Sequence, residues 1–173
     1  NDFIPFGSAQ AGDVTILGGG GSDHVLLWEI PDDVDISLGA ARDQLSFGYG
    51  HFTQHGSSQV AMNAITVSDF ATGGSGDVLN WLTYLGSSLI GWDQTSNPFG
   101  ARFARLLQSG TSTLLQIDLD GRAGTYGYQT LLTLENTSRT AFTSANVAGY
   151  NPSGKNPTGK TLNGTGLGDH IVG

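Results

Sequence analysis

A glycine-rich loop that ends in one aspartate carries the clearest chemistry in this sequence. Residues 18–25 read Gly-Gly-Gly-Gly-Ser-Asp-His-Val, and this order fits the pattern Gly-Gly-x-Gly-x-Asp-x-apolar of calcium-binding repeats. Glycines let the backbone turn tightly enough for carbonyl oxygens to point at an ion, and an aspartate carboxylate is a hard ligand suited to calcium. We therefore expect Gly18, Gly19, Gly21 and Asp23 to bind calcium.

The same pattern returns near the end of the sequence. Residues 164–171 read Gly-Thr-Gly-Leu-Gly-Asp-His-Ile. Leu167 stands where the pattern has glycine, so this copy is less regular than the first. We expect Gly164, Gly166 and Asp169 to take the corresponding calcium-binding roles.

A third candidate site is the segment Asp118-Leu-Asp120-Gly. Two carboxylates on alternate residues before a glycine can chelate one ion. The alternative is a hairpin turn with two solvated aspartates, and the residues alone leave both interpretations open.

The overall charge favours cations as partners. The 173 residues include 15 acidic and 7 basic side chains, and 13 of the acidic ones are aspartates. A net charge of −8 lacks the basic patch that nucleic acid or an anionic membrane surface would need. The absence of cysteine excludes disulfides and thiolate metal sites, and no apolar stretch is long enough to predict a membrane span.

The motifs of common enzymes give no support for catalysis. Residues 154–161 match the phosphate-binding pattern G-x-x-x-x-G-K-T, but the Leu-Asn-Gly-Thr-Gly that follows cannot begin the helix that such a loop requires. His51 and His55 lie four residues apart among glycines, where a helical zinc pair is not expected. We therefore predict that the chain is not an enzyme and binds no nucleotide.

The elements that position these residues are predicted to be short strands. Apolar and alternating runs, separated by glycine turns, mark residues 14–17, 25–28, 34–38, 45–49, 64–67, 101–107, 113–117 and 130–134, and residues 78–92 form the only candidate helix. We predict an all-β fold in which parallel β-roll or solenoid turns flank a β-sandwich-like body. The expected division is a roll-like part over 1–64, a β domain over 65–150, a linker over 151–160 and a further repeat over 161–173.

The middle of the chain resembles a known family. Residues 65–70, 76–79, 114–121 and 131–136 read ITVSDF, GDVL, LLQIDLDG and LLTLEN in this order. The succession is similar to the β-rich C-terminal domain of repeats-in-toxin (RTX) exoproteins and serralysin-type proteases. The resemblance implies a calcium-binding β-roll, type I secretion, and calcium-site or turn roles for Asp69, Asp77, Asp118 and Asp120. The zinc motif of the proteases, His-Glu-x-x-His, is absent.

These observations together predict a calcium-stabilised structural module of a secreted adhesin, surface-layer or filament-forming exoprotein. The alternative is a carbohydrate-binding accessory module that recognises extracellular polysaccharide, with Tyr126 and Tyr128 as its exposed aromatic rings. A further hypothesis concerns identical or neighbouring modules. Joining Gly173 to Asn1 gives the unbroken repeat Asp-His-Ile-Val-Gly-Asn-Asp-Phe-Ile, so modules could stack head to tail.

Overall fold

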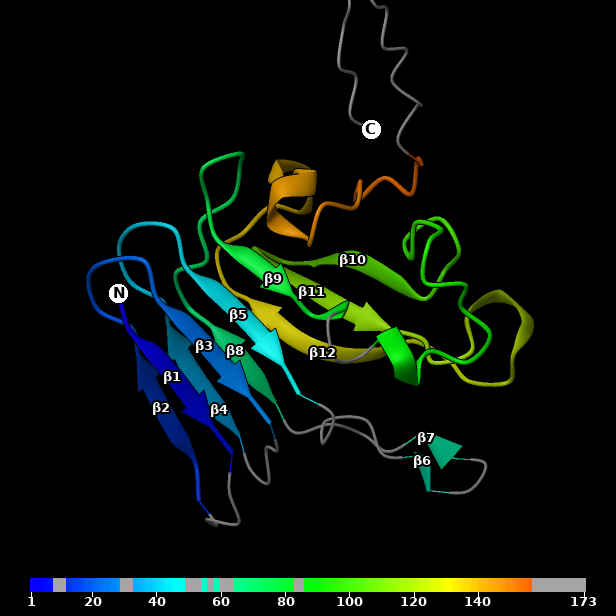
Figure 1. Cartoon of the computed structure of the whole chain (residues 1–173), viewed down its shortest axis with the longest axis horizontal. Helices are drawn as coiled ribbons and strands as arrows, with labels where there is room; N and C mark the ends of the chain where they lie inside the picture. The colour runs from blue at the N-terminus through cyan, green and yellow to red at the C-terminus, as the bar shows by residue number, and fades with distance from the viewer. Residues whose placement is uncertain are drawn as a thin grey trace, which may run out of the picture.

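The structure is a computed structural model that describes residues 1–7, 12–28, 33–48, 54–55, 58–59, 64–82 and 86–156. Within these ranges the regular elements are β-strands and short 3₁₀ helices, which confirms the predicted all-β class. Most strands belong to two sheets, and β6 (Gln54–His55) and β7 (Ser58–Gln59) form a separate small hairpin (Figure 1). No helix in the described part of the chain is long and apolar enough to cross a membrane.

The first sheet is entirely parallel. Its order is β1 (Phe3–Phe6), β3 (His24–Leu27), β5 (Gln44–Phe47) and β9 (Val78–Asn80). The second sheet is mixed, in the order β10 (Ala104–Ser109), β11 (Ser112–Ile117), β12 (Gln129–Leu134), β8 (Ile65–Val67), β4 (Val34–Ser37) and β2 (Val14–Leu17). Strands β10, β11 and β12 are antiparallel neighbours, as the sequence predicts, and the remaining pairs are parallel.

Successive strands from β1 to β5 alternate between the two sheets, and so do β8 and β9. The register repeats with the same step: Val14 pairs with Val34, His24 pairs with Gln44, and Phe3 pairs with His24. Equivalent residues therefore stack about one turn of 20 residues apart. Both sheets continue across residues 64 and 65, because β8 pairs with β4 and β9 pairs with β5.

The core lies between the two sheets, which Figure 1 shows face to face. The mixed sheet contributes Ile16, Val34, Ile36, Ile65 and Val67, and the parallel sheet contributes Val25, Leu27, Leu45, Phe47 and Leu79. Strand β4 shows how the sequence directs this packing, since Val34 and Ile36 are buried while Asp35 between them is exposed. Apolar side chains at every second position leave water together, which stabilises the stacked turns.

The prediction of a helix over residues 78–92 is wrong in the described parts of that segment. Val78–Asn80 is strand β9, and Gly86–Ser88 is a single 3₁₀ turn. The apolar spacing satisfies a strand edge and a buried loop instead: Leu79 and Trp81 are fully buried in the shared core. Tertiary burial therefore overrides the weak helical periodicity.

An asparagine caps the last strand of the parallel sheet. Asn146 is fully buried, and its Oδ1 accepts a hydrogen bond from the N–H of Gly73 at 3.0 Å. Its Nδ2 donates to the carbonyl oxygens of Gly73 and Asp77 at 3.0 and 2.9 Å. These bonds satisfy backbone groups beside β9 that a further strand would otherwise pair.

Candidate metal centre

An aspartate stands directly before each strand of the parallel sheet. These four residues, Asp2, Asp23, Asp43 and Asp77, form what we call the aspartate row. Each backbone N–H donates to Oδ1 of the next member: Asp2 to Asp23 at 2.6 Å, Asp23 to Asp43 at 2.7 Å, and Asp43 to Asp77 at 2.8 Å. The row therefore connects adjacent turns at one end of the sheet and brings acidic side chains from distant parts of the chain together.

Two neighbouring members of the row keep an oxygen without a hydrogen-bond partner. Asp23 is 3% exposed and Asp43 is 1% exposed, and Oδ2 of each is buried with no partner in the described part of the chain. The amino group of Asn1 lies 3.8 Å from Oδ1 of Asp23, not from Oδ2. A buried carboxylate oxygen without a donor or a cation is costly. Both oxygens therefore fit a bound cation such as calcium, which takes carboxylate ligands.

The glycines of the predicted calcium loop have a clear role in stacking. Gly19 and Gly21 have φ angles of +87° and +102°, which L-residues rarely adopt. The carbonyl of Gly19 accepts the N–H of Ala40 at 3.0 Å, and a Cβ at Gly18 would collide with the carbonyl oxygen of Leu38. These glycines let one turn approach the next closely. Calcium ligation by this loop stays a prediction.

Asp69 is occupied by a neighbouring turn. Its Oδ1 accepts the N–H of Leu38 at 2.8 Å, and its Oδ2 accepts the N–H of Gly39 at 2.9 Å and the hydroxyl of Ser37 at 2.7 Å. Three donors satisfy both oxygens. The observed contacts therefore favour the turn role of Asp69 over ligation.

Asp77 is also engaged by backbone groups. Its Oδ1 accepts the N–H of Asp43, and its Oδ2 accepts the N–H of Ala71 at 2.8 Å. Burial raises the pKa of Asp77, the two backbone hydrogen bonds oppose the rise, and the charges of Asp43 and Asp69 add to it. Asp77 thus ends the row as a satisfied carboxylate, and the cation-binding potential lies with Asp23 and Asp43.

The structure places Asp118 and Asp120 side by side in a tight turn. The N–H of Asp120 points to Oδ1 of Asp118 at 3.4 Å, and Oδ2 of Asp120 accepts the N–H groups of Thr125 and Tyr126 at 2.7 and 3.1 Å. Oδ1 of Asp120 is buried without a hydrogen-bond partner among the described residues. Gly124 makes the turn possible, because a Cβ there would overlap the carboxyl group of Asp120.

Proximity separates the acidities of these two carboxyls. Burial, followed by the hydrogen bond with Asp120, raises the pKa of Asp118 to about 6. Burial would also raise the pKa of Asp120, but hydrogen bonds from Tyr126, Asp118 and Thr125 lower it overall. Two like charges this close are disfavoured unless they share a proton or a cation. The pair can therefore serve as a second cation site.

The sequence prediction missed Asp43. Its loop, residues 39–43, reads Gly-Ala-Ala-Arg-Asp and lacks the glycines of the calcium pattern. A usable signal was the spacing: Asp2, Asp23 and Asp43 lie 21 and 20 residues apart, and each immediately precedes a strand. A search for that period would have placed Asp43 next to Asp23.

Other parts of the prediction lie elsewhere or outside the described residues. Gly164, Gly166 and Asp169 fall outside them, as does most of the phosphate-binding pattern at 154–161. No cluster of three or more His, Cys, Asp or Glu side chains that could hold a metal occurs in the described ranges. A site between Asp23 and Asp43 would therefore need backbone carbonyls or water to complete its ligands.

The tyrosines predicted to form an exposed sugar-stacking face are half-buried. The ring of Tyr128 is covered by the guanidinium of Arg105, 3.9 Å from its centre, and its hydroxyl donates to the carbonyl of Arg102. Tyr126 packs against the core. Their ring faces are thus used within the protein.

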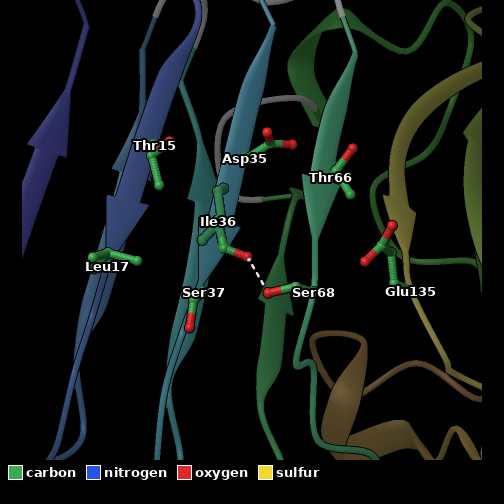
Figure 2. Close-up of a pocket in the computed structure, with 8 residues that line it drawn as sticks. All are labelled: Thr15, Leu17, Asp35, Ile36, Ser37, Thr66, Ser68 and Glu135. Atoms are coloured by element: carbon green, nitrogen blue, oxygen red, sulfur yellow. Dashed lines mark hydrogen bonds between the residues drawn. The ribbon is translucent and has the colours of Figure 1, made fainter.

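The outer face of the mixed sheet has a shallow polar groove of about 360 Å³. Figure 2 shows Asp35, Thr66 and Glu135 directed over this face, with the hydroxyl of Ser68 donating to the carbonyl of Ile36 at 3.2 Å. The two carboxylates and neighbouring hydroxyls are solvent-accessible. The groove extends the acidic character of the molecule but has no buried, unpartnered group comparable to those of the aspartate row.

No protein-family model matches the sequence, and no curated protein matches it. Its function is therefore argued from its own residues and from the motif resemblance described above.

Proposed function

We propose that this chain is a calcium-stabilised structural module of a secreted RTX-type exoprotein that acts as an adhesin, a surface layer or a filament. We propose further that its parallel strands form a β-roll. The alternation of strands between two sheets and the repeat of about 20 residues support this. Solenoid turns of this kind are stabilised chiefly by contacts with their neighbours.

The observation that carries the proposal is the pair of buried oxygens, Oδ2 of Asp23 and Oδ2 of Asp43. They belong to consecutive members of one hydrogen-bonded row, in a chain whose net charge is −8. In the absence of a cation, ionised carboxylates at these places oppose folding. A calcium ion would neutralise them and connect two turns that are 20 residues apart.

This arrangement would couple folding to the surroundings. At low calcium concentration the acidic turns repel one another and the chain stays less folded, which suits passage through a narrow exporter. Outside the cell, calcium binding stabilises the folded state by mass action. We assign Asp118 and Asp120 a second, weaker site, because their turn already uses two backbone donors on Asp120.

Thermal unfolding with and without calcium tests this proposal. We expect EGTA to lower the Tm and added calcium to restore it. Asp43→Asn keeps the size of the side chain but removes its charge, so it should abolish most of the calcium-dependent rise in Tm.

Asp13→Asn is the matched control. Asp13 also directly precedes a strand, β2, but it is exposed. This variant should keep the calcium response of the wild-type chain. An unchanged Tm after chelation, or an equal loss of the response in both variants, would refute the assignment of calcium to the aspartate row.

A further inference from the structure

A cavity of about 420 Å³ lies beside strand β9, away from the aspartate row. The residues that line it and matter here are Asn80, Ser87, Trp92, Gln94 and Tyr150. No described residue in its lining is an acid, a lysine, an arginine or a histidine. Its size falls in the range of small-ligand sites, roughly 300–1,000 Å³. The calcium proposal gives this cavity no role.

Two half-buried aromatic rings shape one side of the cavity. The rings of Trp92 and Tyr150 meet edge to face, 6.3 Å apart at 62°. The indole N–H of Trp92 donates to the carbonyl of Ser96 at 3.1 Å, which fixes the ring. Gly86 lets the ring approach the backbone, because a Cβ there would lie 2.9 Å from it. The aromatic surface is therefore held in place before any ligand arrives.

Two lining residues have backbone conformations that L-residues rarely adopt. Gln94 and Ala148 have φ angles of +58° and +53°. Asp93 supports the first, since its Oδ1 accepts the N–H groups of Thr95 and Ser96 at 2.9 and 2.7 Å. Strained residues concentrate at binding sites, where the surrounding structure holds them for a purpose. Here the strain directs an exposed glutamine to the rim of the cavity.

The chemistry of the lining identifies the class of ligand. Carboxamides and hydroxyls, from Asn80, Gln94 and Ser87, can both donate and accept hydrogen bonds. Aromatic rings offer an apolar face with negative charge density, on which the C–H groups of a pyranose ring can pack. The absence of a lining cation and the net charge of −8 disfavour acidic sugars.

We propose that this cavity binds a neutral saccharide, with Trp92 and Tyr150 packing against a pyranose ring and with Gln94 and Asn80 bonding to its hydroxyls. The site lies outside the aspartate row, so its ligand does not need to touch calcium. The proposal gives the structural module a recognition function of its own. A saccharide on a cell or matrix surface would then anchor the larger exoprotein.

Titration calorimetry with the whole chain in calcium-containing buffer tests this proposal. The probes are tetrasaccharides of glucose, mannose, galactose and N-acetylglucosamine, beside a tetramer of mannuronate. We expect at least one neutral tetrasaccharide to bind with saturable heat and to change the tryptophan fluorescence, and we expect the mannuronate tetramer to give no heat. Absence of binding by all four neutral probes, or preference for mannuronate, would overturn the proposal.

Three variants locate the site. Gln94→Gly removes the side chain and relieves the left-handed strain, so the protein should stay folded while the affinity falls about tenfold, the loss of about one good hydrogen bond. Tyr150→Phe should weaken binding less. The control Tyr128→Phe changes a ring covered by Arg105 and should bind as the wild-type chain does. Unchanged affinity in Gln94→Gly would contradict the assigned site, and a normal calcium response in that variant would show that the calcium proposal stands apart.

Discussion

The backbone N–H of Asp23 donates to Oδ1 of Asp43 at 2.7 Å, and both carboxylates are buried with Oδ2 unpartnered among the described residues. One oxygen of Asp43 thus holds the preceding turn, while the other is left for a different partner. The same hydrogen bond recurs one turn away, between Asp43 and Asp77. At Asp77, however, Ala71 supplies a second donor. The difference between these two turns is what locates the proposed ion.

Asp118 should make stability depend on pH. Its pKa is about 6 in the folded state against an ordinary value of 3.8. The folded state therefore binds this proton more tightly than the unfolded state does. The contribution of Asp118 to stability is present below about pH 4 and is lost as the pH rises to about 6.

Urea unfolding in EGTA between pH 4 and 8 measures this contribution. Asp118→Asn should raise the free energy of unfolding at pH 7 by about 1 to 3 kcal/mol relative to the wild-type chain. The gain should vanish near pH 4, where Asp118 is protonated in both states. A difference between the two proteins that does not change with pH would contradict the assigned interaction with Asp120.

Ala41 occupies a position that glycine occupies one turn earlier. Its φ is +93°, and Gly21, 20 residues before it, has a φ of +102°. Ala41→Gly should raise the free energy of unfolding by about 0.5 to 1 kcal/mol, because relief of left-handed strain exceeds the entropy that glycine loses on folding. The neighbouring Ala40→Gly should lower it instead. Urea unfolding of the two variants decides whether the repeat of backbone conformation is real.

Pro5 protects the open edge of the parallel sheet. The carbonyls of Asp2 and Phe6 accept N–H groups from β3, so the alternate residues Phe3 and Pro5 face away from it. No described strand pairs with that side of β1, and Pro5 has no N–H to offer there. This arrangement opposes head-to-tail stacking through β1. It leaves β2, with Leu17 70% exposed, as the better edge for a neighbouring module.

Pro5→Val should therefore promote self-association, because it completes the donors of an exposed edge strand. Sedimentation velocity at increasing protein concentration should show larger species for this variant than for the wild-type chain. Pro152→Val, in a loop after the last 3₁₀ helix, is the control. Equal sedimentation of all three proteins would show that the edge of β1 is closed by something other than Pro5.

Local patterns predicted much of the fold, and stacking explains what they missed. The strand at Val14–Leu17 and the antiparallel strands around the turn at Gly110 follow from alternation and turn residues. The aspartate row could not be inferred from one loop, since its hydrogen bonds join residues 20 to 34 positions apart. Residues 49–63 also interrupt the 20-residue period before Asp77. The rings of Trp92 and Tyr150 meet only through tertiary packing, so their cavity left no sequence signal.

Anomalous diffraction from crystals grown with calcium tests the central claim most directly. The account predicts a calcium peak at about 2.3–2.6 Å from Oδ2 of Asp23 and from Oδ2 of Asp43. The peak should be missing in crystals of Asp43→Asn grown under the same conditions. Ordered wild-type crystals in which these two oxygens bind only water or protein donors, with no anomalous peak between them, would contradict it.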